Sequence, residues 1–363
     1  MQKIAIIGGG PAGLTAAIDG AKNGLQVDLF DQYEIGDNIR CAEGFFDTLN
    51  MLGKPEDGVR FKVDAIDFRV KNNYSFAADD KVNLWMIDRS EWQIGLAKKA
   101  RELGVQIYEN SPVNKEKMKQ LQADYDWVID ASGAPSVTSK AYGWQSFYKD
   151  TSGLTVQYTM HGDFSKYEGK IYAAILDKYA GYYWIFPKGL DEANVGLIVF
   201  NDTKDNLWHE LERVIEKEGL TSYVRTRKLG GICPVVIPEQ LVYDNAILTG
   251  DAAGLVSALH GGGIDNACVS AKLAIECIVN NEVDTYSNKI HEQLGRKLQG
   301  EQQFADVAYQ ISPTVLDTIF KLLIRSDKTL GDYGFLTGDA AGFLKLKAIR
   351  GFIPPFLKKS VKS

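Results

Sequence analysis

The sequence predicts an α/β protein with a Rossmann-like domain, an inserted antiparallel β-sheet domain and a helical C-terminal region. Three observations carry this prediction: a glycine-rich turn between two apolar segments at the N-terminus, a series of β-rich segments in the middle, and apolar residues at helical spacing further on. With 363 residues, 45% of them hydrophobic and 24% charged, the chain can bury a large core shared by two subdomains.

The N-terminal segment has the composition of a dinucleotide-binding turn. An apolar strand-like run precedes Gly8-x-Gly10-x-x-Gly13, an alanine-rich helix follows, and a second strand ends at Asp31. In such a turn the first glycine permits a tight bend, the second lets backbone N–H groups approach a pyrophosphate, and the third lets the helix pack on the strand. Asp31, 23 positions after Gly8, lies where a carboxylate accepts hydrogen bonds from ribose hydroxyls. We therefore expect a dinucleotide site here.

The hexapeptide TGDAAG occurs twice, and its context separates the two copies. The first, with Asp251, follows the apolar segment NAIL and precedes a glycine-rich start of a helix with apolar residues at helical spacing. This arrangement resembles the second flavin motif of the p-hydroxybenzoate hydroxylase-like FAD superfamily. The resemblance implies that Asp251 contacts the ribityl-pyrophosphate portion of FAD and that the helix start at Gly261 to Ile264 faces the flavin ring. The second copy, with Asp339, lacks both flanks, and we expect only a turn.

Other segments extend the resemblance to the FAD superfamily. Arg89 precedes an amphipathic helix, as the arginine that reaches the cofactor does in the superfamily. Ala131-Ser132-Gly133 resembles the superfamily's middle motif, with Ser132 in place of the expected acid. The cofactor-binding residues implied are Gly8, Gly10, Ala12, Gly13, Asp31, Arg40, Cys41, Arg89, Gly133, Gly250, Asp251, Gly261, Gly262, Gly263 and Ile264.

The middle of the chain is rich in β-forming segments. Four runs between residues 154 and 200 alternate or are continuously apolar and are separated by Gly, Asp and Pro turns, which predicts an antiparallel sheet. Tyr182, Trp184 and Phe186 are two residues apart, so they should lie on one face of a strand. They either line a ligand site or only fill a core.

The aromatic run also carries a family resemblance. Geranylgeranyl reductases have P-x-x-Y-x-W-x-F-P at this place, and the chain matches every fixed position except the first, where Tyr179 replaces Pro. The same family has a cysteine beside the flavin, matched by Cys41, although Ala42 and Ala258 replace a usual Gly and Pro. The sequence from residue 1 to about 280 therefore resembles the geranylgeranyl reductase family of FAD-dependent oxidoreductases.

This resemblance implies an enzyme that saturates carbon–carbon double bonds in a polyprenyl chain. Tyr182, Trp184 and Phe186 would form the wall of an apolar substrate site. The candidates for proton donor are Cys41, Tyr182, His260 and a bound water. The alternative for Cys41 is a small buried side chain, and for His260 a solvated or capping residue of a loop.

Two other function classes remain open at this point. Flavin monooxygenases and halogenases share both flavin motifs, and the halogenases have W-x-W-x-I-P in place of the stretch from Tyr182 to Pro187. A flavoprotein that carries lipid or electrons without catalysis is the third possibility. The sequence holds one G-x-G-x-x-G unit, so we expect an external electron donor, either a reduced protein carrier or transient NAD(P)H.

On this basis we expect three regions. Residues 1–60, 85–150 and 240–285 would form a discontinuous FAD-binding domain. Residues 61–84 and 151–239 would form the substrate-binding sheet domain, and 286–363 a helical region with a basic tail.

Charge and cysteine content limit the partners. A net charge of −6 argues against nucleic acid, and four cysteines without C-x-x-C spacing argue against a metal site. No apolar stretch reaches the ~18 residues of a membrane span and no signal-peptide pattern is present, so we expect a cytoplasmic protein. The tail from Phe343 to Ser363 has six basic and no acidic residues among apolar ones. It predicts either a packed helix or peripheral contact with the inner face of an anionic membrane.

Overall fold

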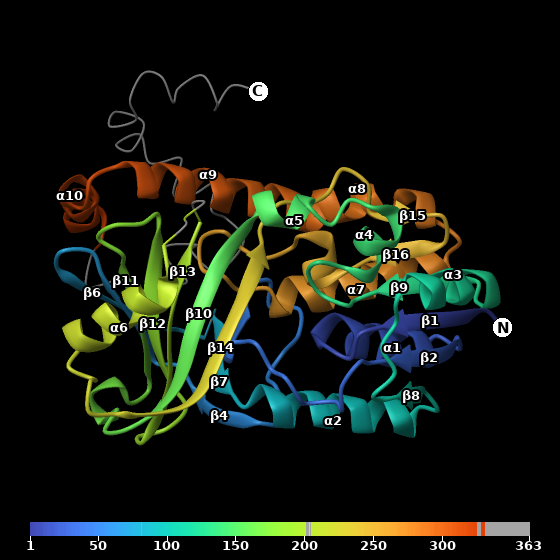
Figure 1. Cartoon of the computed structure of the whole chain (residues 1–363), viewed down its shortest axis with the longest axis horizontal. Coiled ribbons are helices and arrows are strands. Elements are labelled where there is room, and N and C mark those ends of the chain that lie inside the picture. The colour runs from blue at the N-terminus through green and yellow to red at the C-terminus, as the bar shows by residue number, and fades with distance from the viewer. Residues whose placement is uncertain (81, 201–202, 204, 325–327, 331–363) are drawn as a thin grey trace.

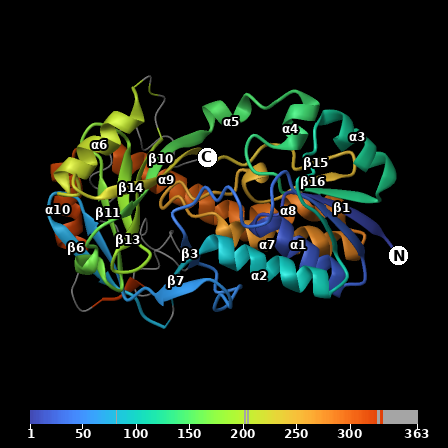
Figure 2. The same ribbon diagram turned by 60° about the horizontal axis from the view of Figure 1, so that its bottom comes forward.

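The computed structural model contains two large β-sheets that lie side by side along the long axis of the molecule (Figures 1 and 2). A third, smaller sheet contacts both parts. The structure describes residues 1–80, 82–200, 203, 205–324 and 328–330. One large sheet is parallel with helices on both faces, and the other is mostly antiparallel, which confirms the predicted α/β class with a Rossmann-like domain.

The parallel sheet occupies the right-hand part of Figure 1. Its strand order is β15-β16-β9-β1-β2-β8, and every pair is parallel except β15 with β16. Because both faces are covered, consecutive residues of β1, β2 and β9 are buried instead of alternating between buried and exposed. The strands are β1 (Lys3–Ile7), β2 (Gln26–Phe30), β8 (Gln106–Tyr108), β9 (Trp127–Asp130), β15 (Val242–Tyr243) and β16 (Ala246–Leu248).

Alternate residues of these strands enter two separate cores. Ile4 and Ile6 of β1 pack under one group of helices, whereas Ala5 and Ile7 pack under the other. The first group consists of α1 (Pro11–Lys22), α2 (Arg89–Glu102) and α7 (Ile264–Val279), and the second of α3 (Lys115–Asp124) and α4 (Val137–Tyr142). The long apolar helix that the sequence predicts after the first TGDAAG is α7.

The larger sheet has the strand order β14-β10-β13-β12-β11-β5-β6. All of its pairs are antiparallel except β5 with β11. The four segments predicted between residues 154 and 200 form β10 to β13, which pair with one another only in antiparallel orientation, as expected. Helix α6 (Leu207–Lys217) packs on one face, and the other face points toward the parallel sheet. The strands are β5 (Ala65–Arg69), β6 (Asn73–Ala77), β10 (Ser152–His161), β11 (Lys170–Ile175), β12 (Gly181–Pro187), β13 (Glu192–Val199) and β14 (Val224–Pro234).

The smaller sheet and the last helices connect the two parts. Strands β3 (Gly44–Asp47), β7 (Asn83–Ile87) and β4 (Val59–Lys62) form the small sheet, and β3 packs against α7. Helix α9 (Arg296–Gln310) runs from α8 (Tyr286–Ile290) beside the parallel sheet toward α10 (Pro313–Leu323) beside the larger one (Figure 1). The short helix α5 (Phe147–Asp150) precedes β10.

Two sequence expectations fall outside this description. The second TGDAAG and the basic tail from Phe343 to Ser363 both lie beyond residue 330, outside the described residues. Within the described ranges no helix is both long and apolar enough to cross a bilayer.

Candidate active site

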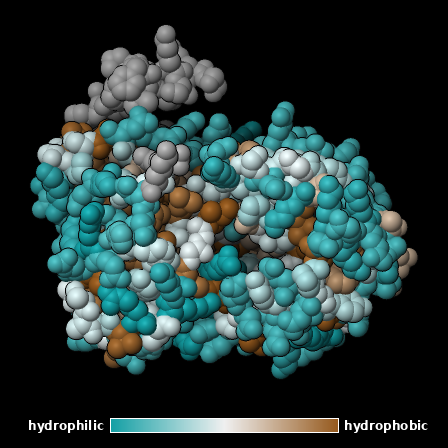
Figure 3. All heavy atoms as spheres, in the orientation of Figure 1, coloured by the Kyte–Doolittle hydropathy of each residue, from teal (hydrophilic) through white to brown (hydrophobic). Residues whose placement is uncertain are grey.

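A cleft of about 780 Å³ separates the parallel sheet from the larger sheet. The space-filling view shows the hollow between these two parts, with apolar residues along it (Figure 3). The volume falls in the range of small-molecule and cofactor sites. The predicted residues that line it are Gly8, Gly10, Ala12, Asp31, Arg40, Cys41, Arg89, Gly133, Tyr182, Trp184, Phe186, Gly250, Asp251, His260, Gly261, Gly262, Gly263 and Ile264.

The glycine turn after β1 shows why each position lacks a side chain. Gly8 has φ 101°, and a Cβ on Gly13 would lie 1.8 Å from the Gly8 carbonyl oxygen, because α1 packs directly on the turn. Gly13 thus supports the site without lining the cleft. A Cβ on Gly10 meets only Arg89 Nη2, at 4.0 Å, so the protein leaves open space there. Gly10 also precedes α1 without a side-chain cap, which leaves the first N–H groups of the helix free for an anion.

Asp31 fixes the loop on the other side of this turn. Its carboxylate accepts hydrogen bonds from the backbone N–H groups of Gly9 (2.5 Å) and Tyr33 (2.8 Å). Burial raises the pKa of Asp31 above its ordinary value, although both hydrogen bonds lower it. Because a carboxylate has about four acceptor positions, two bonds to the backbone leave capacity for ligand hydroxyls.

The first TGDAAG lies beside the glycine turn. A Cβ on Gly250 would be 3.2 Å from Cβ of Ala12, so the two motifs pack together. Burial raises the pKa of Asp251, while the charge of Arg89 lowers it. None of the residues that the structure describes donates a hydrogen bond to the Asp251 carboxylate. A half-buried carboxylate that lines the cleft without a protein donor can accept hydrogen bonds from a ligand.

Helix α7 begins where its N–H groups also face the cleft. Gly263 precedes the helix without a side-chain cap, and Gly261 adopts φ 65°. A Cβ on Gly261 would lie 2.8 Å from the Tyr182 hydroxyl, which places this loop directly against the larger sheet. The positive end of the α7 dipole therefore points to the zone where the two walls meet.

The aromatic run of β12 lies on this facing wall. Tyr182, Trp184 and Phe186 share the cleft-side core, whereas Tyr183 and Ile185 point to the core under α6. The Trp184 indole lies over Gly196 of β13, where an added Cβ would be only 2.4 Å from its ring. Each of the three cleft-side rings is less than a tenth exposed.

The three candidate proton donors differ in what surrounds them. Burial raises the pKa of Tyr182 well above its ordinary value, so its hydroxyl keeps its proton. Cys41 is half-buried at the cleft, and its Sγ accepts the Glu43 N–H at 3.2 Å. His260 Nδ1 accepts the Gly262 N–H at 3.2 Å, and its Nε2 is shielded from solvent without a hydrogen-bond partner. His260 is therefore half-buried, and the bond to the Gly262 N–H fits the alternative of a residue that caps the loop.

Arg89 and Ser132 shape the cleft from the parallel-sheet side. Arg89 begins α2, and its Nε donates to Gln93, which in turn donates to the Gly9 carbonyl. Ser132, at the position where the superfamily has an acid, donates through Oγ to Asp130 at 2.6 Å. Asp130 also caps α4 by accepting the Thr138 N–H. Ser132 thus stabilises the local turn through its bond to Asp130. Gly133 of the same turn has φ 80°.

Three polar residues at or next to the cleft, of which Gln157 lines it, were missed from the sequence. Gln157 and Asn194 are buried on the cleft side of β10 and β13, and Glu43 is buried next to Cys41. Their signal was a polar residue within an apolar strand, as in Val156-Gln157-Tyr158. The residues described contain no group of three or more His, Cys, Asp or Glu that could hold a metal ion.

Two family models match parts of the chain. Residues 152–229 match the geranylgeranyl reductase catalytic domain, and residues 2–166 match pyridine nucleotide-disulphide oxidoreductase. The chain is therefore similar to geranylgeranyl reductases and to flavin-dependent oxidoreductases. The first match covers β10 to β13, the strands that carry the aromatic wall, and the second covers the glycine turn and Asp31.

Individual proteins show the same similarity. Digeranylgeranylglycerophospholipid reductase 2 of Methanothermobacter thermautotrophicus is 26% identical over 89% of this chain and 92% of its own length. A geranylgeranyl bacteriochlorophyll reductase-like protein from Thermoplasma acidophilum has a similar crystal structure, with a TM-score of 0.77 and 22% identity over 97% of this chain and 99% of that one. The flavin-dependent halogenase CmlS shares the fold, with a TM-score of 0.65 and 20% identity over 97% of this chain and 70% of its own.

Proposed function

We propose that the chain binds FAD in the cleft and reduces carbon–carbon double bonds in the prenyl chain of a lipid or diphosphate. The observation that carries this proposal is the contact between the two walls. The loop that begins α7 lies against Tyr182, so a ligand at the helix start and an apolar chain along β12 would be neighbours. The named activity of the similar methanogen reductase agrees with this reading.

The described residues that line the cleft fit both the adenosine-pyrophosphate part and the flavin part of FAD. The uncapped start of α1 and the space at Gly10 suit the pyrophosphate, while Asp31 suits the ribose hydroxyls. The donorless carboxylate of Asp251 suits the ribityl hydroxyls. The uncapped start of α7 suits the ring edge that becomes negative on reduction. Arg40, Arg89 and Gly133 complete the lining on this side.

The chain's own residues then determine the reaction. When bound, the reduced flavin supplies a hydride to one carbon of the double bond. Trp184 and Phe186 would hold the chain and exclude water from it, since both are buried and apolar. Cys41 and Tyr182 line the cleft and carry a proton for the other carbon. His260 also lines the cleft, but its Nδ1 accepts the Gly262 N–H and its Nε2 is shielded from solvent without a partner, so we rank it below the other two. The electrons come from an external donor, and the basic tail provides contact with a membrane surface.

An anaerobic reoxidation experiment tests this proposal. Chemically reduced enzyme, kept free of oxygen, should be reoxidised by a geranylgeranyl-bearing lipid, with two hydrogens added for each double bond. Trp184→Ala should slow this reoxidation at least about tenfold while leaving the flavin bound, because Trp184 lies on the sheet wall. No reoxidation without oxygen, together with an oxygenated product in air, would reject the proposal in favour of a monooxygenase or halogenase.

A further inference from the structure

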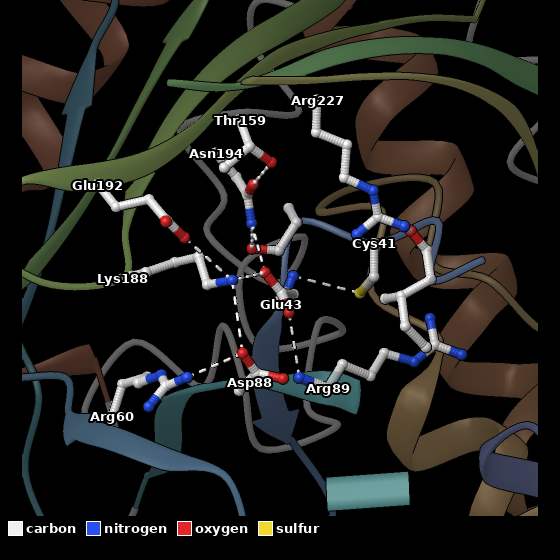
Figure 4. A network of polar contacts seen from close by, with 12 residues as sticks. Cys41, Glu43, Arg60, Asp88, Arg89, Thr159, Lys188, Glu192, Asn194 and Arg227 are labelled. Atoms are coloured by element: carbon white, nitrogen blue, oxygen red, sulfur yellow. Dashed lines mark hydrogen bonds and ion pairs between the residues drawn. The ribbon is translucent and has the colours of Figure 1, made fainter. Parts of the chain in front are cut away.

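The loop that carries Cys41 has no regular secondary structure of its own. Between the end of β2 at Phe30 and the start of β3 at Gly44, the chain contains neither strand nor helix. Such a loop has a fixed position only if side chains from elsewhere hold its backbone. Figure 4 shows that polar side chains from the larger sheet converge on this part of the chain.

Three strands of the sheet each hold one carbonyl of this loop. Gln157 of β10 donates to the Cys41 carbonyl (3.1 Å), and Asn194 of β13 donates to the Ala42 carbonyl (3.2 Å). Arg227 of β14 donates to the Ile39 carbonyl (2.7 Å). The contacts are separated by more than 100 residues in the sequence, so the folded sheet alone brings them together.

The two amides are themselves fixed at their other ends. Gln157 Oε1 accepts the indole N–H of Trp184 at 3.2 Å, and Asn194 Oδ1 accepts the Thr159 hydroxyl at 2.8 Å. An amide with both ends engaged has one orientation here, because a flip would place the amide oxygen against a backbone carbonyl oxygen. Gln157 thereby connects the aromatic wall to the backbone of Cys41.

Glu43 completes the arrangement from within the loop. It is buried with φ 69°, a left-handed conformation that is uncommon for a residue with a side chain. Its carboxylate accepts from Asn194 (2.8 Å) and from the Arg89 N–H (3.1 Å), and it pairs with Lys188 at 3.0 Å. In this conformation the Glu43 N–H points at the Cys41 sulfur. A strained residue held by three partners next to a candidate proton donor indicates a functional constraint.

We propose that Gln157, Asn194 and Glu43 are positioning residues that set the Cys41 thiol against the cleft. Gln157 and Asn194 hold the carbonyls of Cys41 and Ala42, and the backbone N–H of Glu43 donates to the thiol itself. The position of the thiol therefore depends on these three residues. The role of this thiol in the reaction rests on the proposed function, whereas its position in the folded protein does not. Glu43 and the two amides would thus act through Cys41 and not on the substrate.

Alkylation of Cys41 in the flavin-loaded protein tests this inference without a substrate. The rate of reaction with iodoacetamide at fixed pH is followed by mass spectrometry of the Cys41 peptide. Gln157→Met and Asn194→Leu keep the side-chain size but lose the hydrogen bonds, so they should release the loop and raise the rate by about two- to tenfold. Glu43→Gly should do the same, since glycine accepts the left-handed backbone but removes the carboxylate.

Glu192→Gln is the matched control. Glu192 pairs with the same Lys188, at 3.1 Å, but does not touch the Cys41 loop, so the rate should stay at the wild-type value. With a prenyl substrate, the three positioning variants should lower kcat more than they raise KM. Wild-type alkylation rates and kcat in Gln157→Met and Asn194→Leu, with only a lower melting temperature, would show that the contacts merely stabilise the fold and would overturn the inference.

The outcomes also separate this inference from the proposed function. If no prenyl lipid reoxidises the enzyme but the alkylation rates change as stated, the positioning inference stands and the proposed reaction fails. If reoxidation occurs as proposed but the alkylation rates do not change, the reaction stands and the positioning inference fails.

Discussion

The two walls of the cleft are built from different parts of the polypeptide. On the parallel-sheet side, backbone groups line the cleft. They belong to the glycine turn around Gly10, the turn at Gly250 and the uncapped start of α7. On the opposite side it meets side chains, among them Trp184 and Gln157, which come from separate strands. A wall of N–H groups suits phosphates and a charged ring edge, whereas a wall of rings suits an apolar chain.

The difference explains where each wall tolerates change. A ligand can reach the backbone N–H groups only where no side chain stands in the way. A single methyl group added at a glycine can therefore abolish binding on this wall. The side-chain wall instead depends on packing, and volume-conserving exchanges within it cost little. One wall can therefore keep its backbone geometry while the side chains of the other change.

The largest expected effect comes from two glycines of the backbone wall. Gly10→Val should keep the fold, because the nearest neighbour of an added Cβ lies 4.0 Å away. It should weaken flavin binding at least about 100-fold, because the side chain would fill the open space proposed for the pyrophosphate. Gly13→Val should instead lower the free energy of unfolding by about 3 kcal/mol, since its Cβ would lie 1.8 Å from a carbonyl oxygen. Flavin absorbance after purification and denaturant unfolding measure the two. Wild-type flavin affinity in Gly10→Val would contradict the assignment of this turn.

The difference between the two walls also explains which site residues could be predicted from the sequence. The backbone wall is encoded in short contiguous motifs, so Gly8, Gly10, Asp31 and Asp251 were identified from spacing and family resemblance. The aromatic wall was predictable to the extent that one strand carries it, because residues two apart share a face. In the structure Tyr182, Trp184 and Phe186 do lie on one face of β12.

The remaining features depend on contacts between distant segments. Gln157 and Asn194 meet the Cys41 loop only because β10 and β13 are paired, and no local pattern reports that pairing. The parallel pairing of β5 with β11 joins segments about 100 residues apart and was missed for the same reason. The burial of His260 results from Phe46 and from Glu301 of α9, neither of which is near it in the sequence.

The second prediction acts on the side-chain wall alone. Gly196→Val should push the Trp184 ring off β13, because the added Cβ would be 2.4 Å from it. We expect a loss of about 1–3 kcal/mol in stability and strongly slowed reoxidation by a prenyl substrate, with flavin still bound. Gly189→Ala is the control, since its Cβ meets only an Asp191 oxygen at 3.6 Å. Loss of flavin in Gly196→Val would show that the two walls are not independent.

The third prediction concerns the carboxylate of the backbone wall. Burial raises the pKa of Asp251, so its ionised form costs stability above that raised pKa, and the cost disappears as the pH falls below the ordinary value of 3.8. In flavin-free protein, Asp251→Asn should therefore be more stable than the wild type by about 1 kcal/mol at neutral pH. It should also bind flavin more weakly. Thermal unfolding of both proteins from pH 7 downward measures the difference, and an unstable Asp251→Asn would mean that the carboxylate has a structural partner.

The smallest expected effect is at His260, where the two walls meet. Burial lowers its pKa, with Lys297 adding to this, while Glu301 and Asp265 act in the opposite direction. In the unfolded chain, His260 binds a proton near pH 6.5, whereas in the folded protein it binds that proton only at a lower pH. Stability should therefore fall as the pH drops from 6.5 to the lowered pKa, and His260→Gln should flatten this part of the curve.

The measurement for His260 is denaturant unfolding of flavin-free protein between pH 7.5 and 5, run in parallel for the wild type and His260→Gln. The two curves should converge at the upper end of the range, where His260 is neutral in both states, and separate at the lower end. If the wild type instead gains stability on acidification relative to His260→Gln, the imidazole is protonated in the fold. Glu301, whose carboxylate lies 4.0 Å from His260 Nε2, would then outweigh burial, and His260 would return as a source of the proton for the cleft.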